Sequence, residues 1–376
     1  MMQNPFITFG YAGPEYFCDR IMETEKLKKL LLNGNNIVLM SQRRLGKTGL
    51  LYHTFAQEEI KENYNTFIID IYSTKTLNDL VFEIGKAILG SLKSRGRKAM
   101  ERFLDIVSSL KPGVTFDIMG NATWNLEQGT MHSPSYMLDQ IFEYLNASDR
   151  PCIVAIDEFQ QIMYYPEKNV EETLRTYIQK CSKAVFVFSG SERHLLSEMF
   201  HSPARSFYAS TTTLPLGCID KEKYIDFAIS HFRNAGKTIV PEAVAKVYER
   251  FEGVTWFMQK TMNQLFFDTG RGETCTPAMV GIAVREIICD NSTIYEDLLY
   301  QLTSRQRDLL VAINREGKAK AITGSRFIRK HHLSSASTIQ TTIKSLQERQ
   351  LVTRTLDTYE VYDKFFALWL MGEDGK

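Results

Sequence analysis

Short, continuous apolar runs recur along the first 218 residues of the chain and alternate with segments of helical spacing. The runs lie at residues 37–40, 66–72, 152–159, 184–191 and 211–217. A run without an alternating polar face is typical of a strand that is covered on both sides of its sheet. The pattern therefore predicts an α/β fold, in which helices cover both faces of a mostly parallel sheet.

Residues 94–132 interrupt this alternation, and we interpret them as an insertion in the core. After a basic start, residues 99–110 predict a helix, and residues 113–126 alternate like the two strands of a hairpin. Ser133-Pro134 then predicts the start of a helix that ends near residue 146. Because the insertion lies outside the core pattern, it is our candidate surface for a protein partner.

The pattern changes at residue 219, where strands give way to helices. Residues 221–297 predict helices only. The remaining segment predicts three helices and a hairpin, at 304–315, 323–332, 335–349, 351–355 and 359–366. Three helices with a β-ribbon are typical of a winged helix. We therefore expect a core domain at 1–218, a helical domain at 219–300 and a winged-helix domain at 301–376.

The first apolar run leads directly into a phosphate-binding pattern, SQRRLGKT, which a helix follows. A strand, a loop and a helix N-terminus in this order direct backbone N–H groups toward a phosphate. The candidate nucleotide-binding residues are Ser41, Gln42, Arg43, Arg44, Leu45, Gly46, Lys47, Thr48 and Gly49. Lys47 would contact the β- and γ-phosphates, and the Thr48 hydroxyl would bind Mg²⁺. Ser41 stands where the usual pattern has its first glycine.

Two adjacent carboxylates, Asp157 and Glu158, lie near the end of the third apolar run. At the end of a buried strand, this pair has the Walker B form. Asp157 would hold Mg²⁺, partly through water, and Glu158 would act as the general base for the attacking water. An isolated acidic pair at a strand end is commonly a solvated turn, but a phosphate loop about a hundred residues earlier favours the catalytic interpretation.

The fourth run ends in a third polar element, the hydroxyls of Ser189 and Ser191. In a parallel sheet this strand end lies at the same edge as Asp157, so Ser191 is a candidate sensor of the γ-phosphate or of the water. A simple N-cap for the next helix is the alternative.

Composition narrows the kinds of partner. The net charge is +1, so no overall field favours nucleic acid or a membrane surface. The six cysteines lack the spacing of a zinc site or a redox pair. Neither a signal peptide nor an apolar run of transmembrane length is apparent. We expect a cytoplasmic protein without membrane contact.

Together the motifs resemble those of the archaeal-type ATPase family, within the AAA+ and STAND groups of P-loop NTPases. In that family, an aromatic residue and an arginine precede a loop similar to GPRRxGKT. The matching stretches here are residues 16–20 with Glu23, 41–48, 156–160, 190–191 and 362–369. The resemblance covers nearly the whole chain.

The resemblance implies an ATPase that binds ATP or ADP with Mg²⁺ and hydrolyses ATP slowly, as a switch. Our favoured hypothesis is that the helical domain is a lid, and that nucleotide state is coupled to an unknown protein partner through the lid and the winged helix. The resemblance also implies adenine contacts from the lead-in, around Arg20. Because a second subunit supplies an arginine in some phosphoryl-transfer enzymes, an oligomer also stays open.

Two other functions remain open at this point. Residues 303–376 carry thirteen Lys and Arg against eight Asp and Glu, a charge of +5, with Arg326 and Arg329 on the second expected helix. A nucleotide-gated DNA-binding regulator would use these side chains on phosphates. A scaffold that binds ATP or ADP without hydrolysing it is the other alternative.

Overall fold

The computed structural model describes residues 4–93, 114–116, 122–124 and 134–373. The chain forms two compact units. The first spans Phe9–Ile219, and the second combines Met1–Thr8 with Asp220–Lys376. Each unit is described by itself.

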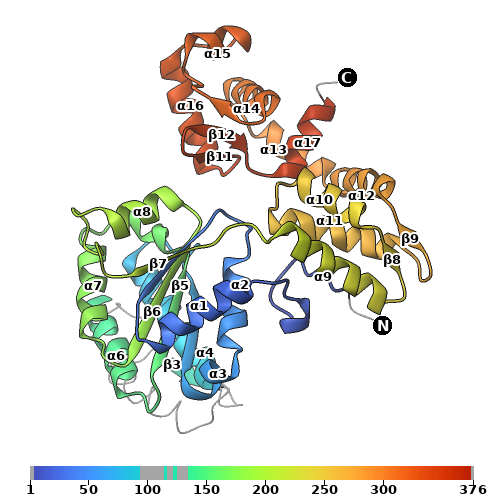
Figure 1. Cartoon of the computed structure of the whole chain (residues 1–376). Coiled ribbons are helices and arrows are strands. Elements are labelled where there is room, and N and C mark those ends of the chain that lie inside the picture. The colour runs from blue at the N-terminus through green and yellow to red at the C-terminus, as the bar shows by residue number, and fades with distance from the viewer. Residues whose placement is uncertain (1–3, 94–113, 117–121, 125–133, 374–376) are drawn as a thin grey trace. The chain divides into compact units, whose positions relative to one another are not determined.

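The first unit is built on a parallel sheet with helices packed around it (Figure 1). The sheet has five strands in the order β2-β5-β6-β1-β7. Its strands are β1 (Ile37–Met40), β2 (Asn65–Asp70), β5 (Cys152–Asp157), β6 (Ala184–Gly190) and β7 (Thr212–Pro215). Each strand lies within or next to one of the five apolar runs. The parallel α/β fold predicted from those runs is thereby confirmed.

Successive residues of each central strand alternate between two apolar layers. In β1, Ile37 and Leu39 pack on one side of the sheet, whereas Val38 and Met40 pack on the other. The first side is covered by α1 (Ile21–Leu32), α2 (Lys47–Phe55) and α3 (Glu58–Asn63). The second is covered by α4 (Leu77–Lys93), α6 (Pro134–Ala147), α7 (Val170–Lys180) and α8 (Arg193–His201). Burial of both faces explains why the strands lack a polar side.

Part of the expected insertion is described. The strands β3 (Val114–Phe116) and β4 (Ala122–Trp124) pair antiparallel, as the alternation at 113–126 predicts. The helix expected at 99–110 lies outside the described residues.

The second unit begins with helices, but residues 221–297 are not helical throughout. Its helices here are α9 (Lys221–Asn234), α10 (Pro241–Arg250), α11 (Thr255–Asp268), α12 (Pro277–Asp290) and α13 (Ser292–Tyr300). Two short strands, β8 (Thr238–Ile239) and β9 (Thr274–Cys275), pair in parallel. The prediction of helices only was wrong here, because each strand ends one residue before an X-Pro step, which favours extended backbone.

The first residues of the chain also pack in this unit, although the expected core domain began at residue 1. Phe6 is fully buried, and its ring lies 5.9 Å from the rings of Phe232 and Phe266. The side-chain amide of Asn263 donates a hydrogen bond to the Phe6 carbonyl at 2.8 Å. An apolar side chain near the chain start is thus held by aromatic contacts that no local pattern predicts.

The C-terminal part has the predicted order of three helices and a hairpin. It contains α14 (Ser304–Glu316), β10 (Ala319–Lys320), α15 (Ser325–Lys330), α16 (Ala336–Glu348), β11 (Val352–Thr355) and β12 (Thr358–Val361). The second hairpin strand was expected to continue to residue 366, but it ends at Val361 and α17 (Lys364–Glu373) follows. The Asp363 carboxylate accepts hydrogen bonds from the backbone N–H groups of Phe365 and Phe366, at 2.9 and 3.1 Å. This capping begins a helix where the apolar run favoured a strand.

Aromatic side chains join α17 to the helices that precede the winged helix. The Phe365 ring lies 5.1 Å from Phe251 and 5.5 Å from Phe257, and both contacts are edge-to-face. All three rings are 2% exposed or less. Burial of this much apolar area makes the contact a main source of stability in this unit.

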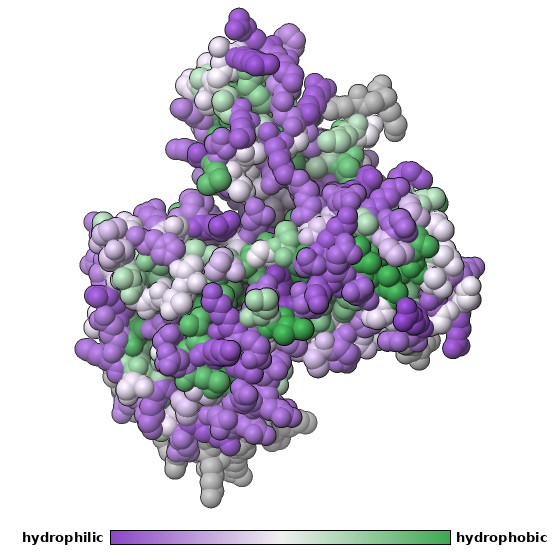
Figure 2. All heavy atoms as spheres, in the orientation of Figure 1, coloured by the Kyte–Doolittle hydropathy of each residue, from purple (hydrophilic) through white to green (hydrophobic). Residues whose placement is uncertain are grey.

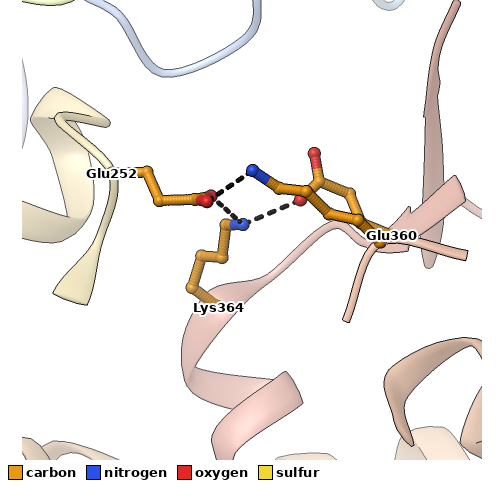
Figure 3. Close-up of polar contacts among 4 residues, drawn as sticks. Glu252, Glu360 and Lys364 are labelled. Atoms are coloured by element: carbon orange, nitrogen blue, oxygen red, sulfur yellow. Dashed lines mark hydrogen bonds and ion pairs between the residues drawn. The ribbon is translucent and has the colours of Figure 1, made fainter. Parts of the chain in front are cut away.

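An ionic cluster lies at the surface between the same elements. Glu252, in the turn after α10, accepts hydrogen bonds from Lys318 at 2.5 Å and from Lys364 at 3.0 Å. Lys364 also pairs with Glu360 at 2.8 Å, and Figure 3 shows its ammonium directed toward both carboxylates. Burial alone would raise the pKa of Glu252, but the two lysines outweigh it and lower the pKa. The stabilisation from Glu252 is therefore present at neutral pH and is lost as the pH falls through the lowered pKa.

In the described ranges, no helix is long and apolar enough to cross a membrane.

We predict that the rings, and not the ionic cluster, dominate the stability of this contact. Phe365→Ala should lower the free energy of unfolding by about 3–5 kcal/mol. Glu252→Gln should lower it by less than about 1 kcal/mol, because the carboxylate is partly solvated and salt screens it. Glu249→Gln, which removes an exposed pair with Lys221, is the matched control. Amide hydrogen exchange in α17 measures both effects, and an equal loss from Glu252→Gln and Phe365→Ala would contradict the prediction.

Candidate nucleotide site

The loop of residues 41–48 joins the end of β1 to the start of α2. Gly46, the N-cap of α2, has φ 90°, a left-handed conformation that favours glycine. Arg44 also has a positive φ, of 65°, whereas Ser41 is not among the described residues with positive φ. The Ser41 hydroxyl is buried and donates to the Gln42 carbonyl at 2.7 Å. The usual motif has glycine at this position. Serine fits here because the backbone does not need a positive φ and because its hydroxyl bonds the next carbonyl.

Lys47 lies at the N-terminus of α2 and is 6% exposed. Burial lowers the pKa of its ammonium, while the negative charges of Glu158 and Asp157 oppose that change and Arg43 adds to it. A buried cation at a helix N-terminus gains stabilisation from a bound anion. Its position is suited to a phosphate group.

Asp157, at the end of β5, contacts both the first turn of α2 and the end of the neighbouring strand β6. The Thr48 hydroxyl donates to Oδ2 of Asp157 at 2.6 Å, although the two residues are 109 positions apart. The Ser189 hydroxyl, at the end of β6, donates to Oδ1 at 2.6 Å. The carboxylate is 5% exposed. The ends of β1, β5 and β6 thus place Thr48, Asp157 and Ser189 in direct contact.

The strand β5 ends at Asp157, two residues before the apolar run ends, and Glu158 follows in a left-handed conformation with φ 55°. It precedes the 3₁₀ helix η2 (Phe159–Tyr164). The Ser191 hydroxyl donates to its Oε2 at 2.7 Å, and the Gln160 amide donates to the same oxygen at 2.6 Å. The structure therefore brings Glu158 and Ser191 together. Gln160 is the contact that the sequence did not indicate as functional, because only the η2 turn directs it back toward Glu158.

Arg20 lies beside the loop but directs its guanidinium at protein groups. It is 3% exposed and has φ 62°. It donates to Glu23 at 2.7 Å, to the Leu45 carbonyl at 3.3 Å and to the Gly217 carbonyl at 2.7 Å. These bonds tie the lead-in to the loop and to the segment after β7. An adenine contact from Arg20 stays a prediction.

The remaining candidates surround the same loop. Gln42 is exposed, and Leu45 is buried. The Arg43 guanidinium lies 5.2 Å from the centre of the Tyr72 ring. A side chain at Gly49 would meet the Phe17 ring at 3.4 Å, so the first turn of α2 lies closely against the lead-in.

The residues present fit a magnesium ion that arrives with a nucleotide. Within the described ranges, no group of three or more His, Cys, Asp and Glu side chains could hold a metal. Mg²⁺ prefers oxygen ligands and often takes only one or two from the protein beside substrate phosphates. The Thr48 hydroxyl and the Asp157 carboxylate, in mutual contact, supply such oxygens.

We predict that Arg20 anchors the loop. Arg20→Met leaves two carbonyl oxygens without their donor and should destabilise the first unit by about 2–4 kcal/mol without nucleotide. Thermal unfolding of the nucleotide-free protein measures this loss, and Arg43→Met, at a more exposed side chain, is the control. An unchanged unfolding temperature with weakened ATP binding would instead make Arg20 a nucleotide contact.

Comparisons with known proteins bear on the fold. A family model described as a probable winged helix domain matches residues 293–372. No curated protein sequence matches the chain. A Walker-type ATPase of Pyrococcus abyssi is similar in structure, with a TM-score of 0.63 and 18% identity, over 98% of this chain and 99% of that one.

Two Aeropyrum pernix proteins are also similar. The ORC2 protein, in ADPNP–ADP complexes, has a TM-score of 0.58 and 13% identity over 100% of this chain and 99% of its own. The ORC1 protein, in complex with DNA, has a TM-score of 0.55 and 13% identity over 100% and 98%. At these identities the likeness establishes the fold alone, which this chain shares with the Walker-type ATPase and the two ORC proteins.

Proposed function

We propose that this protein binds ATP with Mg²⁺ at residues 41–48 and hydrolyses it. The observation that carries the proposal is the contact between the Thr48 hydroxyl and Asp157 at 2.6 Å, next to the buried ammonium of Lys47. A phosphate loop alone binds many anions. A hydroxyl and a carboxylate joined beside it are the oxygen pair that a nucleotide-bound magnesium ion needs.

Each residue then has a separate task. Backbone N–H groups of the loop and Lys47 neutralise the phosphates, and Thr48 and Asp157 hold the magnesium ion. The bound ion would offset charge on the β- and γ-phosphate oxygens. Ser189 keeps Asp157 oriented through its 2.6 Å hydrogen bond.

Glu158 is the proposed general base. It lies one residue beyond Asp157, and its Oε1 has no hydrogen-bond partner among the described residues, whereas Oε2 accepts from Ser191 and Gln160. A carboxylate with one free oxygen can accept a proton from water as that water attacks the γ-phosphate. Ser191 lies close enough to Glu158 to sense this step.

We further propose that nucleotide state acts on a partner through the second unit, as a STAND-type switch. The support is architectural: the nucleotide residues all lie within Phe9–Ile219, while the winged helix belongs to the other unit. A protein partner and an oligomer are both compatible with this arrangement.

We expect Mg²⁺-dependent ATP turnover by the full chain. Glu158→Gln should lower turnover by at least about 100-fold while ATP binding survives, because the neutral amide cannot accept the proton. Lys47→Ala should weaken binding itself. Glu172→Gln, an exposed residue on α7, is the matched control.

Three results would contradict this. ATP binding without turnover in the wild type would favour a nucleotide-binding scaffold. Turnover that persists in Glu158→Gln would remove Glu158 as the base. No binding at all would show that the loop with Ser41 does not hold a nucleotide.

A second candidate function, DNA binding, is favoured by the exposed face of the winged helix. Arg326 and Arg329 on α15 are exposed, as are Gln340, Thr341 and Lys344 on α16. On the face that Figure 2 displays, hydrophilic residues cover most of the winged-helix elements. The ORC1 protein, similar in fold, was solved with DNA. Arginines position a protein on phosphates, and polar helix residues read base edges.

If the winged helix binds duplex DNA, replacing Arg326 and Arg329 together by alanine should weaken binding and reduce the slope of log K against log salt by about 2. Fluorescence anisotropy over a salt series measures this slope. Arg233→Ala, at an exposed arginine on α9, should change nothing. An unchanged slope in the double variant would exclude these arginines as phosphate contacts.

A further inference from the structure

We propose that Gln160 is a positioning residue for hydrolysis, which with Ser191 holds Oε2 of Glu158 so that Oε1 faces the attacking water. The inference rests on the proposed function, since it concerns the same base. Gln160 touches neither nucleotide nor water in this role and acts only through Glu158.

The geometry concentrates two donors on one oxygen. The Gln160 amide lies 2.6 Å and the Ser191 hydroxyl 2.7 Å from Oε2. A carboxylate oxygen has about two lone-pair directions, so these donors occupy Oε2. The two donors come from different segments, η2 and the residue after β6. Together they restrict the side-chain torsions of Glu158, which would otherwise be free to rotate.

The burial of Gln160 leaves only its donor with a hydrogen-bond partner. The residue is 3% exposed, and its Oε1 is buried with no hydrogen-bond partner among the described residues. An unpaired buried acceptor costs about 1–3 kcal/mol. An apolar side chain of the same length would avoid that cost, so the feature that accounts for a glutamine here is the bond that its amide donates to Glu158.

Gly190 belongs to the same arrangement. A Cβ on Gly190 would lie 2.0 Å from Oε1 of Gln160, a distance that real atoms do not tolerate. Glycine thus makes room for the amide, and the next residue, Ser191, supplies the second donor. Gly190, Ser191 and Gln160 therefore act together on Glu158: the glycine leaves space for the amide, and the other two residues donate to the carboxylate.

The chemical step defines what the positioning must achieve. An O–H bond of water breaks as its proton passes to Oε1 of Glu158. The water oxygen bonds to the γ-phosphorus, the bond from that phosphorus to the bridging oxygen breaks, and ADP leaves with the electron pair. If the Glu158 side chain rotates, the proton acceptor is displaced, and a displacement of about 1 Å can lower the rate of hydrolysis about 10²-fold.

The test compares Gln160→Met with Gln161→Met in the full chain. Methionine keeps the length and removes the unpaired acceptor together with the donor, so the relieved cost and the lost bond should largely offset each other and the protein should stay folded. The side-chain amide of the neighbouring Gln161 donates to the Thr74 carbonyl and not to the Glu158 carboxylate. Its backbone N–H bond to the Glu158 carbonyl is kept when the side chain is replaced, so Gln161→Met is the matched control. We expect Gln160→Met to lower kcat about tenfold with ATP affinity unchanged, since general-base catalysis is worth about 10²–10⁴-fold and only its alignment is lost.

A double-mutant cycle separates positioning from structure. Glu158→Asp shortens the base and withdraws it from both donors, so adding Gln160→Met in that background should cost less than about twofold. Gly190→Ala, which displaces the amide by another route, should lower kcat to a similar level and should not add to Gln160→Met.

The outcomes are distinct. No ATP turnover by the wild type overturns the proposed function and this role together. Wild-type turnover that Gln160→Met leaves intact overturns the role of Gln160 alone. Equal losses in both backgrounds, with a falling unfolding temperature and weaker ATP binding, would make Gln160 a structural residue and also overturn the proposal.

Discussion

The first unit depends on one constraint, which is that its strands run parallel and end at one edge. Because β1, β6 and β5 are neighbours in the sheet, the chain leaves the sheet three times at the same edge, on adjacent strands. The hydroxyls of Thr48 and Ser189 meet the Asp157 carboxylate there, each at 2.6 Å. An antiparallel sheet would place alternate ends at opposite edges and could not collect these groups.

That edge also holds backbone strain. Arg20, Arg44 and Glu158 all have φ between 55° and 65° without being glycine, and each such residue costs about 1–3 kcal/mol. The cost is met because two apolar layers fix the strands, and because hydrogen bonds hold Arg20 and Glu158 in place. Arg44 lies in the phosphate loop and Glu158 at the strand end beside it, so part of the backbone strain lies at the proposed site, while the other described positive-φ residues are spread along the chain.

The sequence predicted the structure best for elements in which every residue is buried, such as the central strands of the sheet. Runs such as 37–40 predicted the parallel sheet because strands covered on both faces have no polar positions. The two motifs assigned Thr48 and Asp157 to the same magnesium ion, and the structure places these residues in contact. The strands β8 and β9 have two residues each, too few for any periodicity. The start of α17 depends on the cap from Asp363, which outweighed the strand-like pattern around it. The bond from Gln160 to Glu158 depends on the path of η2, and its one signal in the sequence is its spacing from the base.

The second unit constrains how any nucleotide-driven movement could reach the winged helix. Separating α17 from α10 and α11 would expose the rings of Phe251, Phe257 and Phe365, which are almost completely buried. That cost is several times larger than the loss of the Glu252 ion pairs, which are partly solvated. The rings therefore hold the winged helix to the helices before it, and the ionic cluster adds only a small part of the stability of this contact. A movement that leaves these rings packed must carry the helical and winged-helix elements together, so a switch in this chain would act on the second unit as one body.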